Sequence, residues 1–374
     1  MKKLILNIVL VSVLVLAFAS CNGKDRIAIT VAAGATNVSY YISGTGTVSI
    51  DTGDGNKKTF ELDAVNAFEN NFYDSSEHTI TITGENITQL HCYNNNLISL
   101  DVSEAPALIY LYCADNNLTG LDVSKNTALI ELHCLNNQLT SLDVSKNIAL
   151  TNLNCPNNQL TSLEVGKNTA LTVLYCYSNQ LTNLDVSKNT MLTELDCCHN
   201  QLTRLEASQN TALTNLDCAY NQLTNLDVSK NTALTVLRCD HNQLTSLDIS
   251  KNTVLENLHS YNNQLKNLDA RGAIALTFLA CANNQLTCLD VSKNIALEEL
   301  DCSNNQITNL DVSKNIALKE LECNNNQLTG SALNTLFGTL HSNDVEEKRI
   351  NISGNPEYED CDESIATDKG WEVE

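Results

Sequence analysis

Aromatic and histidine side chains gather at four recurring positions of a 21-residue repeat, three and one residues before a cysteine and one and two residues after it. Seven of the 11 tyrosines fall there. A tyrosine ring offers a large contact area with a polar tip at low entropic cost, which suits recognition. The alternative is that aromatic residues simply tolerate an exposed parallel sheet. The positions predict a ligand-binding surface of Tyr93, Tyr110, Tyr112, His133, Tyr175, Tyr177, His199, Tyr220, Arg238, His241, His259, Tyr261 and Phe278.

Acidic side chains occupy the same four positions in other repeats. Asp196 and Asp217 are predicted to be neighbours one strand apart, with His199 and His241 nearby, so a cation could bridge them. The alternative is that the two carboxylates repel each other and that solvent eases this repulsion. We predict no bound metal and no other cofactor. The remaining acids on this surface are Glu131, Glu194, Asp240 and an acidic patch of Glu299, Asp301, Glu320 and Glu322 that could receive a basic partner.

Motifs of catalysis are missing from the chain. It contains no H-E-x-x-H, no G-x-S-x-G, no P-loop and no paired C-x-x-C sites. Asp51-Thr52-Gly53 matches the triplet of aspartic proteases, but that chemistry needs two facing carboxylates and the triplet occurs once. A hairpin turn explains these residues, and we predict that the protein is not an enzyme.

The repeat that positions the aromatic residues reads CLNNQLTSLDVSKNIALTNLN in its cleanest copy, Cys134 to Asn154. A cysteine returns every 21 residues from Cys92 to Cys323, with Ser260 as the one exception. A leucine lies two residues before each of these 12 positions and an asparagine three residues after. The alternation around the leucine predicts a short strand, and no stretch is long enough for a helix. Stacked copies therefore predict a curved rod with one parallel sheet.

The cysteine and asparagine positions are predicted to face the interior. A thiol acts as a small hydrophobe in a narrow core, and the serine at position 260 fits packing better than metal ligation or redox chemistry. Neighbouring thiols of in-register strands point the same way, which is a poor geometry for disulfides, so we expect reduced cysteines. An inward asparagine can bond turn backbone that forms no sheet ladder.

This pattern resembles the leucine-rich-repeat family, and its 21-residue length and cysteine position are most similar to the internalin-type repeats of bacterial surface proteins. The resemblance covers residues 87–328. It implies a mostly β, right-handed solenoid of about twelve turns with a concave parallel sheet. It also implies that the concave face binds a protein.

Charge limits the classes of partner. The chain has 22 Lys and Arg against 44 Asp and Glu, a net charge of −22. This excess disfavours nucleic acid and anionic membrane surfaces and permits a basic partner. Solubility of a long exposed rod is the alternative explanation.

The N-terminal residues predict export. Residues 1–20 have a basic start, an apolar run and small residues before Cys21, a pattern that resembles a bacterial lipoprotein signal. An ordinary secretory signal or an anchor helix is the alternative. Lipidation of Cys21 would attach the protein to the outer membrane, facing the cell surface, through residues 21–25 as a tether.

Regions of different composition flank the repeats. Residues 26–84 are β-branched and predict a small β-sandwich-like cap, and Thr52-Gly53-Asp54-Gly55 resembles part of a polycystic-kidney-disease-type domain. Residues 85–330 form the predicted solenoid, and residues 331–374 a C-terminal α+β cap. In that cap Ser331 is the predicted helix N-cap, and Trp371 is predicted to pack against the last repeat.

Together these features predict a lipid-anchored recognition protein, such as an adhesin, that binds a protein ligand. Two alternatives remain at this stage. The aromatic strip could stack on sugars, which would make the protein a glycan-binding module, or the rod could be a spacer without a specific ligand.

Overall fold

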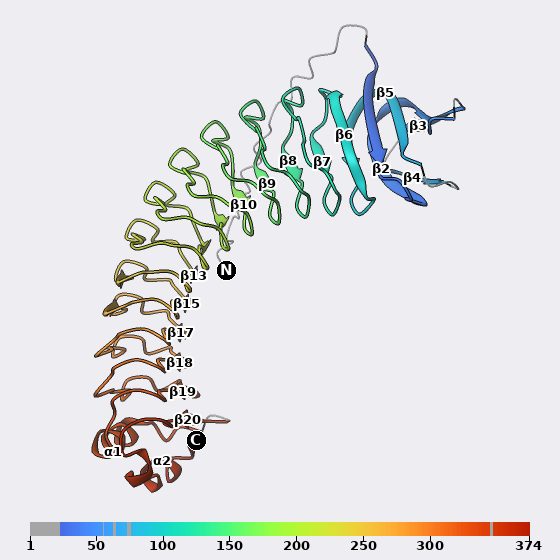
Figure 1. The fold of residues 1–374 in the computed structure, drawn as a ribbon. Coiled ribbons are helices and arrows are strands. Elements are labelled where there is room, and N and C mark those ends of the chain that lie inside the picture. The colour runs from blue at the N-terminus through green and yellow to red at the C-terminus, as the bar shows by residue number, and fades with distance from the viewer. Residues whose placement is uncertain (1–22, 55, 63–64, 73–75, 345–346) are drawn as a thin grey trace, which may run out of the picture.

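The structure is a computed structural model that describes residues 23–54, 56–62, 65–72, 76–344 and 347–374. The chain forms an arc of stacked turns, with a β-rich end and a partly helical end (Figure 1). The parallel strands line the inner side of the arc, and the return segments lie on the outer side. In the described part, no helix is both long enough and apolar enough to cross a membrane.

One parallel ladder runs through the solenoid. It starts at the end of β5 (His78–His91), where Gln89 pairs with Tyr110 of β7, and it ends where β20 pairs with β21. Corresponding leucines align on every strand, as Leu174 does with Leu195. The successive strands are β7 (Tyr110–Tyr112), β8 (Glu131–His133), β9 (Asn152–Asn154), β10 (Val173–Tyr175), β11 (Glu194–Asp196), β12 (Asn215–Asp217), β13 (Val236–Arg238), β15 (Asn257–His259), β17 (Phe278–Ala280), β18 (Glu299–Asp301), β19 (Glu320–Glu322), β20 (Arg349–Asn351) and β21 (Glu372–Val373).

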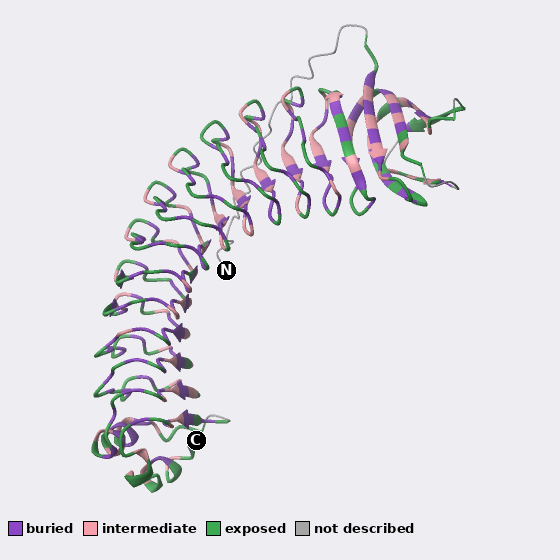
Figure 2. Ribbon diagram, in the orientation of Figure 1, coloured by how far each residue is buried: buried purple, intermediate pink, exposed green. Residues whose placement is uncertain are grey.

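This ladder confirms the solenoid predicted from the repeat. Each of the twelve cysteine or serine residues directly follows the last residue of a strand. Ile352 takes the same place after β20, which adds one turn. The central leucine of each strand from β7 to β19 is buried, while its two neighbours are mostly more exposed, as the colours in Figure 2 show. The single core is therefore continuous from the first turn to the last.

Inward asparagines of the first column satisfy several backbone groups each. Asn158 Nδ2 donates to the carbonyl oxygens of Cys134, Cys155 and Pro156 at 3.0, 3.1 and 3.2 Å, and its Oδ1 accepts from Leu139 N at 3.0 Å. These groups lie where the chain leaves the strand, so no sheet partner is available to them. The asparagines therefore bond turn backbone, as predicted, and they also join consecutive turns.

The cysteines form a reduced, buried ladder. The 11 cysteines of the column are 0 to 1% exposed, and all 14 described cysteines are free. Burial raises the pKa of Cys92 and Cys134 well above the usual thiol value, which keeps them protonated. Ser260 fits the same place because its Oγ donates to Ala280 O at 3.3 Å, as Cys197 Sγ does to Asp217 O at 3.5 Å.

A second asparagine column supports the convex side, and sequence reasoning missed it. Asn147 is 0% exposed, and its Nδ2 donates to Val123 O and Asn126 O at 2.9 and 2.8 Å. The column breaks at Ala273, where the preceding Gly272 lies so close to Ser250 O that a Cβ would sit 1.8 Å from it. On this side β14 (Ser246–Asp248) and β16 (Asn267–Asp269) form a separate parallel pair.

The N-terminal strands cover the open end of the first turn. β2 (Asn37–Asp51) pairs antiparallel with β5, and β1 (Asp25–Val31) pairs with β5 and with β6 (Leu97–Glu104), the return segment of the first repeat. β3 (Lys57–Leu62) and β4 (Asn66–Asn71) pair with the two halves of β2. Both edges of the first turn are thus paired, which removes a template for aggregation.

Two strands of this end have features that follow from their residues. The strand β2 is continuous from Asn37 to Asp51, with a bulge at Gly44. A Cβ on Gly44 would lie 2.1 Å from Asn86 O, so only glycine allows β2 to stay paired with β5 there. The strand β4 was not predicted, because Asn66–Asn71 is rich in asparagine and lacks β-branched residues.

The C-terminal cap closes the other end. It contains α1 (Gly330–Thr339), the 3-10 turn η1 (Tyr358–Asp360) and the short helix α2 (Ser364–Thr367). Thr329, not Ser331, caps α1, because its side chain accepts from Ala332 N. Trp371 is 2% exposed and donates through Nε1 to His341 O at 2.9 Å, so its predicted packing role is confirmed.

Candidate ligand-binding surface

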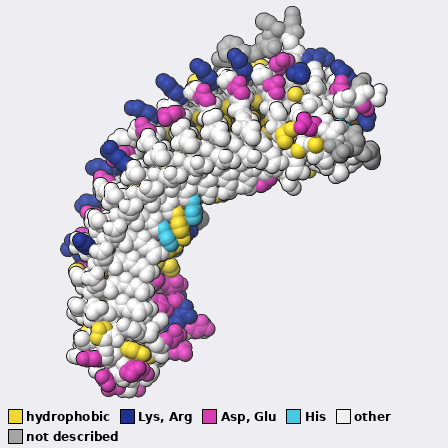
Figure 3. Space-filling model, viewed as in Figure 1, with side chains coloured by type: hydrophobic (Ala, Val, Ile, Leu, Met, Phe, Trp, Pro, Cys, Tyr) yellow, Lys and Arg dark blue, Asp and Glu magenta, His cyan; other side chains and the backbone are white. Residues whose placement is uncertain are grey.

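The predicted site residues all lie along the concave side, and each is partly or largely exposed. Seven lie on the strands themselves, at the two outward positions beside the buried leucine. Tyr93, Tyr177 and Tyr261 follow the buried cysteine or serine, and His199, Tyr220 and His241 come one residue later, at the rim. Figure 3 shows histidine and hydrophobic side chains gathered at the inner rim midway along the arc. The surface is one face, but its rings form two separate groups.

The N-terminal ring cluster consists of Tyr41, His91, Tyr110, Tyr112 and His133. Tyr112 lies at its centre, with ring centroids 4.4 Å from His91 and 4.6 Å from His133. Tyr110 stacks beside Tyr112 at 6.4 Å, and Tyr41 approaches His91 at 6.3 Å. Tyr41 comes from β2 and was not predicted, because no repeat spacing points to a strand that pairs antiparallel with the first repeat.

Burial sets the protonation of this cluster. Desolvation lowers the pKa of His91 and of His133, so both imidazoles are neutral at pH 7. Tyr112 donates its hydroxyl to Glu131 Oε2 at 2.7 Å, and desolvation together with this bond raises its pKa. The cluster therefore offers neutral rings held in place by a carboxylate, with Tyr93 beside it 48% exposed.

The turns of β9 and β10 lie between the two ring groups. The outward positions of β9 carry Asn152 and Asn154, and Pro156 follows the buried cysteine. Tyr175 lies on β10, where its hydroxyl bonds Glu194, and this bond is the largest cause that raises its pKa to about 12.

The central ring cluster contains His199, Tyr220, His241, Tyr261, His259 and Phe278. The His199 and Tyr220 rings stack at 4.1 Å and 14°, and Tyr220 and His241 stack at 3.9 Å and 12°. Tyr261 meets the edge of His241 at 5.2 Å, and His259 lies 4.8 Å from Phe278. Six predicted residues from five consecutive turns are thus in ring contact.

The middle one of the three stacked rings, Tyr220, occupies a backbone position that does not favour it. In every turn from Asn94 to Asn325 this residue has a positive φ of 51 to 55°. Asparagine, aspartate and histidine adopt this left-handed region most readily, and asparagine occupies most turns. Tyrosine is disfavoured there. The chain thus accepts local backbone strain at Tyr220, and such strain is a feature of functional surfaces.

Two carboxylates and a thiol lie beside the central ring cluster. Asp196 and Asp217 are paired in register on β11 and β12, and Cys198 is close to both. Burial is the main cause that raises the pKa of Asp196 and that raises the pKa of Asp217 to about 6. Arg238 Nε lies 3.5 Å from Asp217 Oδ2 and partly offsets their charge.

One acid predicted on the exposed face is buried. Asp240 is 0% exposed, in contrast to the other predicted acids, because it sits beneath the rim between Ala219 and Tyr261 in successive turns. Its Oδ2 lies 3.0 Å from His241 Nδ1, while its Oδ1 has no hydrogen-bond partner. Column position placed Asp240 directly after the buried Cys239, but it did not reveal that the residue at this position is often buried.

The acidic patch lies where the sequence placed it. Glu299 pairs in register with Glu320, and Asp301 with Glu322, so four acids face the concave side near the C-terminal end (Figure 3). Arg349 on β20 bonds Glu320 at 2.6 Å. Desolvation is the largest cause that raises the pKa of Glu322.

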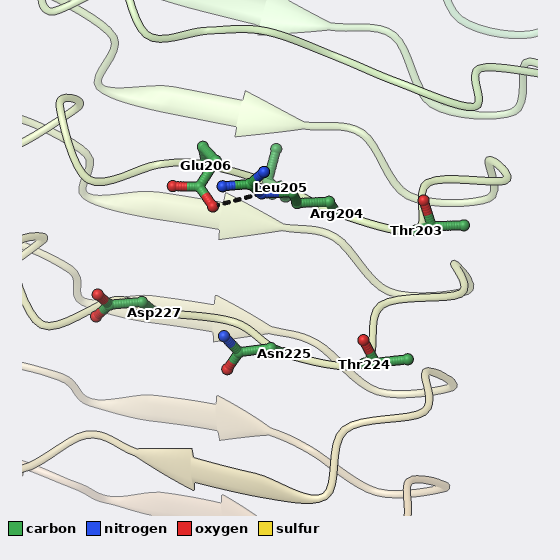
Figure 4. Close-up of a pocket in the computed structure, with 7 residues that line it drawn as sticks. All are labelled: Thr203, Arg204, Leu205, Glu206, Thr224, Asn225 and Asp227. Atoms are coloured by element: carbon green, nitrogen blue, oxygen red, sulfur yellow. Dashed lines mark hydrogen bonds and ion pairs between the residues drawn. The ribbon is translucent and has the colours of Figure 1, made fainter.

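Two open hollows lie away from the predicted residues. One has a volume of about 320 Å³ between consecutive return segments, where Arg204 pairs with Glu206 at 2.7 Å (Figure 4). The other, of about 580 Å³, lies beside the exposed Ile274 and Ile295 on the convex edge. Neither hollow is lined by a predicted site residue.

The stacked turns, concave sheet and outward columns define a leucine-rich-repeat solenoid, and solved structures agree. The internalin InlF from Listeria monocytogenes is similar with a TM-score of 0.61 and 21% identity, over 72% of this chain and 81% of that one. The functional domain of InlJ from the same organism, described as including a cysteine ladder, is 30% identical over 75% of this chain and 76% of that one, with a TM-score of 0.46.

A further similar structure is the LRIM1/APL1C complex, with a TM-score of 0.56 and 24% identity, over 68% of this chain and 55% of that one. Comparison with protein-family models gives no match, and comparison with curated proteins gives none. The particular likeness is therefore to internalins and other leucine-rich-repeat proteins, and it rests on the fold.

Proposed function

We propose that this protein is a non-enzymatic recognition scaffold that binds a protein ligand across its concave face. The observation that carries the proposal is the pair of ring clusters on one surface, separated by the turns of β9 and β10 and bordered by an acidic patch. The strands, or the turns directly after them, hold these rings in contact with one another, so little side-chain freedom remains to be lost on binding. A face of this width suits a protein surface better than a small molecule, which would need a cavity.

The comparison with the LRIM1/APL1C complex supports this proposal, because that leucine-rich-repeat structure is a complex of two named proteins. The chain's net charge of −22 and its acidic patch further favour a ligand with a basic surface. We propose attachment to the outer membrane through lipid on Cys21 and a role at the cell surface such as adhesion. Cys21 lies outside the described residues, so this part rests on the sequence pattern alone.

Binding to a panel of surface proteins and glycans tests the proposal, with residues 23–374 as the soluble probe. Two double variants divide the face: Tyr93→Ala with Tyr110→Ala removes two tyrosines near its N-terminal end, and Tyr177→Ala with Tyr220→Ala removes two near its middle. Loss of a buried aromatic anchor weakens a protein interface about tenfold or more, so at least one variant is expected to show that loss. Lys146→Ala with Lys188→Ala on the convex edge is the matched control.

The salt dependence separates the classes of ligand. A basic protein ligand is expected to bind more weakly as the salt concentration rises, because screening shortens the range of its electrostatic attraction to the acidic patch. A glycan that stacks on the rings would depend on two or three tyrosines and respond little to salt. Ligand binding that both double variants retain, or no ligand in the panel, would contradict concave-face recognition and favour a spacer.

A further inference from the structure

We propose that Asp196, Cys198 and Asp217 form a binding site for a divalent metal ion of the zinc type on the concave face. This inference does not depend on the proposed protein ligand. It departs from the sequence-based expectation of no metal, because the sequence indicated the two carboxylates but not the thiol beside them.

The geometry brings three donor atoms together. Asp196 and Asp217 are register partners on β11 and β12, and one ligand atom from each lies within 4.8 Å of the other and of Cys198 Sγ. Ligand atoms around tetrahedral zinc are about 3.3–3.8 Å apart, given bond lengths of about 2.0–2.3 Å, so a small side-chain movement closes the set. The parallel strands fix the two carboxylates side by side.

Backbone hydrogen bonds orient both carboxylates. Asp196 Oδ1 accepts from Cys198 N at 3.1 Å, and Asp217 Oδ1 accepts from Ala219 N at 3.0 Å. The second oxygen of Asp217 lies 3.5 Å from Arg238 Nε, so a metal ion would compete with this guanidinium for it. Such outer-shell support is what holds metal-binding carboxylates in position.

Cys198 has no part in the core ladder. The buried ladder position of this turn is filled by Cys197, while Cys198 is only partly buried. The residue type at this position varies from turn to turn, so the repeat pattern does not require a thiol there. A thiolate with two carboxylates is a donor set that zinc accepts, and a fourth position would remain open for water or for a ligand group.

A buried carboxylate next to the cluster gives an independent sign of missing positive charge. Asp240 is 0% exposed, and its Oδ1 has no hydrogen-bond partner. It lies in the turn after Asp217, where Tyr220 N donates to the carbonyl oxygen of Asp240 at 3.0 Å. Arg238 is the guanidinium beside this group, but its side chain is 45% exposed and 3.5 Å from Asp217. A buried acid group without full compensation is costly, and a divalent cation would supply the charge.

The test is a titration of the metal-depleted full soluble chain with cobalt(II) and then zinc(II), under a phosphine reductant. Binding of cobalt(II) to Cys198 releases the thiol proton to the buffer and produces a thiolate-to-cobalt charge-transfer band. One equivalent is expected, and zinc(II) should displace it. Cys198→Ser should remove the band, and Asp217→Asn should weaken cobalt binding by about tenfold or more.

Three variants and a fold measurement complete the design. Cys288→Ser removes the exposed cysteine and should leave the titration unchanged, as should Asp301→Asn, which alters a paired acid of the acidic patch. Arg238→Gln should keep or tighten binding, because it removes a competing cation. Unchanged circular dichroism without metal would show that each variant folds.

Two results would overturn the proposal. One is the absence of the charge-transfer band in both the wild-type chain and Arg238→Gln at a roughly tenfold excess of cobalt(II). The other is equal metal binding by Cys198→Ser and the wild-type chain.

Discussion

At the scale of single residues, the chain relies on polar side chains that no sheet can replace. Each asparagine of the first column bonds backbone groups of two turns, and the same contact recurs along the solenoid, for example at Asn137, Asn158 and Asn221. The stacked rings at the rim show the opposite choice, since Tyr220 takes a position where asparagine would be relaxed. The inward column thus carries the residue type that stabilises the fold, whereas some rim positions carry residues that serve the surface.

Asn158→Ala is expected to lower the free energy of unfolding by about 2–4 kcal/mol, because it leaves Leu139 N and the carbonyl oxygens that Asn158 bonds without partners. Urea denaturation followed by circular dichroism measures this difference. Gln159→Ala, an exposed position in the next residue, is the control and should change it by less than about 0.5 kcal/mol. Equal effects of the two variants would contradict the role of the asparagine column.

At the scale of elements, charged side chains bond the free backbone groups at the end of a helix and in the convex turns. Lys369 Nζ donates to Phe337 O, Gly338 O and Leu340 O at 2.9, 2.7 and 2.8 Å, and so satisfies the C-terminal end of α1. On the convex edge, aspartates such as Asp143 accept from the backbone of the residue two positions later.

Lys369→Met should destabilise the C-terminal cap by about 1–3 kcal/mol, since it exposes the last carbonyls of α1 and removes a favourable charge at the helix end. Lys319→Met removes only an exposed ion pair with Glu298 and should cost less than about 1 kcal/mol. Thermal melting of the two variants compares them directly. A larger loss in the Lys319 variant would contradict the capping role.

The convex aspartates predict acid sensitivity. Backbone hydrogen bonds lower the pKa of Asp122, Asp143 and Asp311 below the ordinary value of 3.8. As pH falls, the unfolded chain takes up these protons first, so their stabilising contribution is present above 3.8 and is lost as pH falls through the folded pKa. Replacing several of them by asparagine should flatten the fall in unfolding free energy below about pH 4, as measured by urea titration at successive pH values. An unchanged dependence of the unfolding free energy on pH would argue against the convex aspartates as the source of acid sensitivity.

At the scale of the whole molecule, the solenoid needs both of its ends covered. The parallel sheet would expose an unpaired edge at β5, and β2 and β1 close that edge and the return segment behind it. The N-terminal strands also supply Tyr41 to the first ring cluster, so the cap contributes to the surface as well as to the core.

Removal of residues 23–77 should convert a monodisperse chain into an aggregating one, because β5 then presents free backbone groups and the apolar side of the first turn becomes exposed. Light scattering of the fragment 78–374 beside the fragment 23–374 measures the difference. A monomeric shorter fragment with an unchanged melting curve would show that the N-terminal strands are not needed as a cover.

The sequence by itself determined the repeat register, the buried leucine, cysteine and asparagine columns, and the face on which the predicted tyrosines and histidines lie. A fixed period of 21 residues does this because identical turns stack with identical neighbours, so spacing along the chain becomes position in space. The packing of Trp371 followed from its place in the cap in the same way.

Only the tertiary structure decided which outward residues meet and how deep each one lies. It placed Tyr41 beside His91 through an antiparallel pairing far apart in the sequence, buried Asp240, and brought Cys198 to Asp196 and Asp217. It also set the left-handed backbone on which His199, Tyr220 and His241 stack. Periodicity determines the column in which a side chain lies. Its burial and its ring contacts depend on the side chains of the neighbouring turns, which vary from one turn to the next.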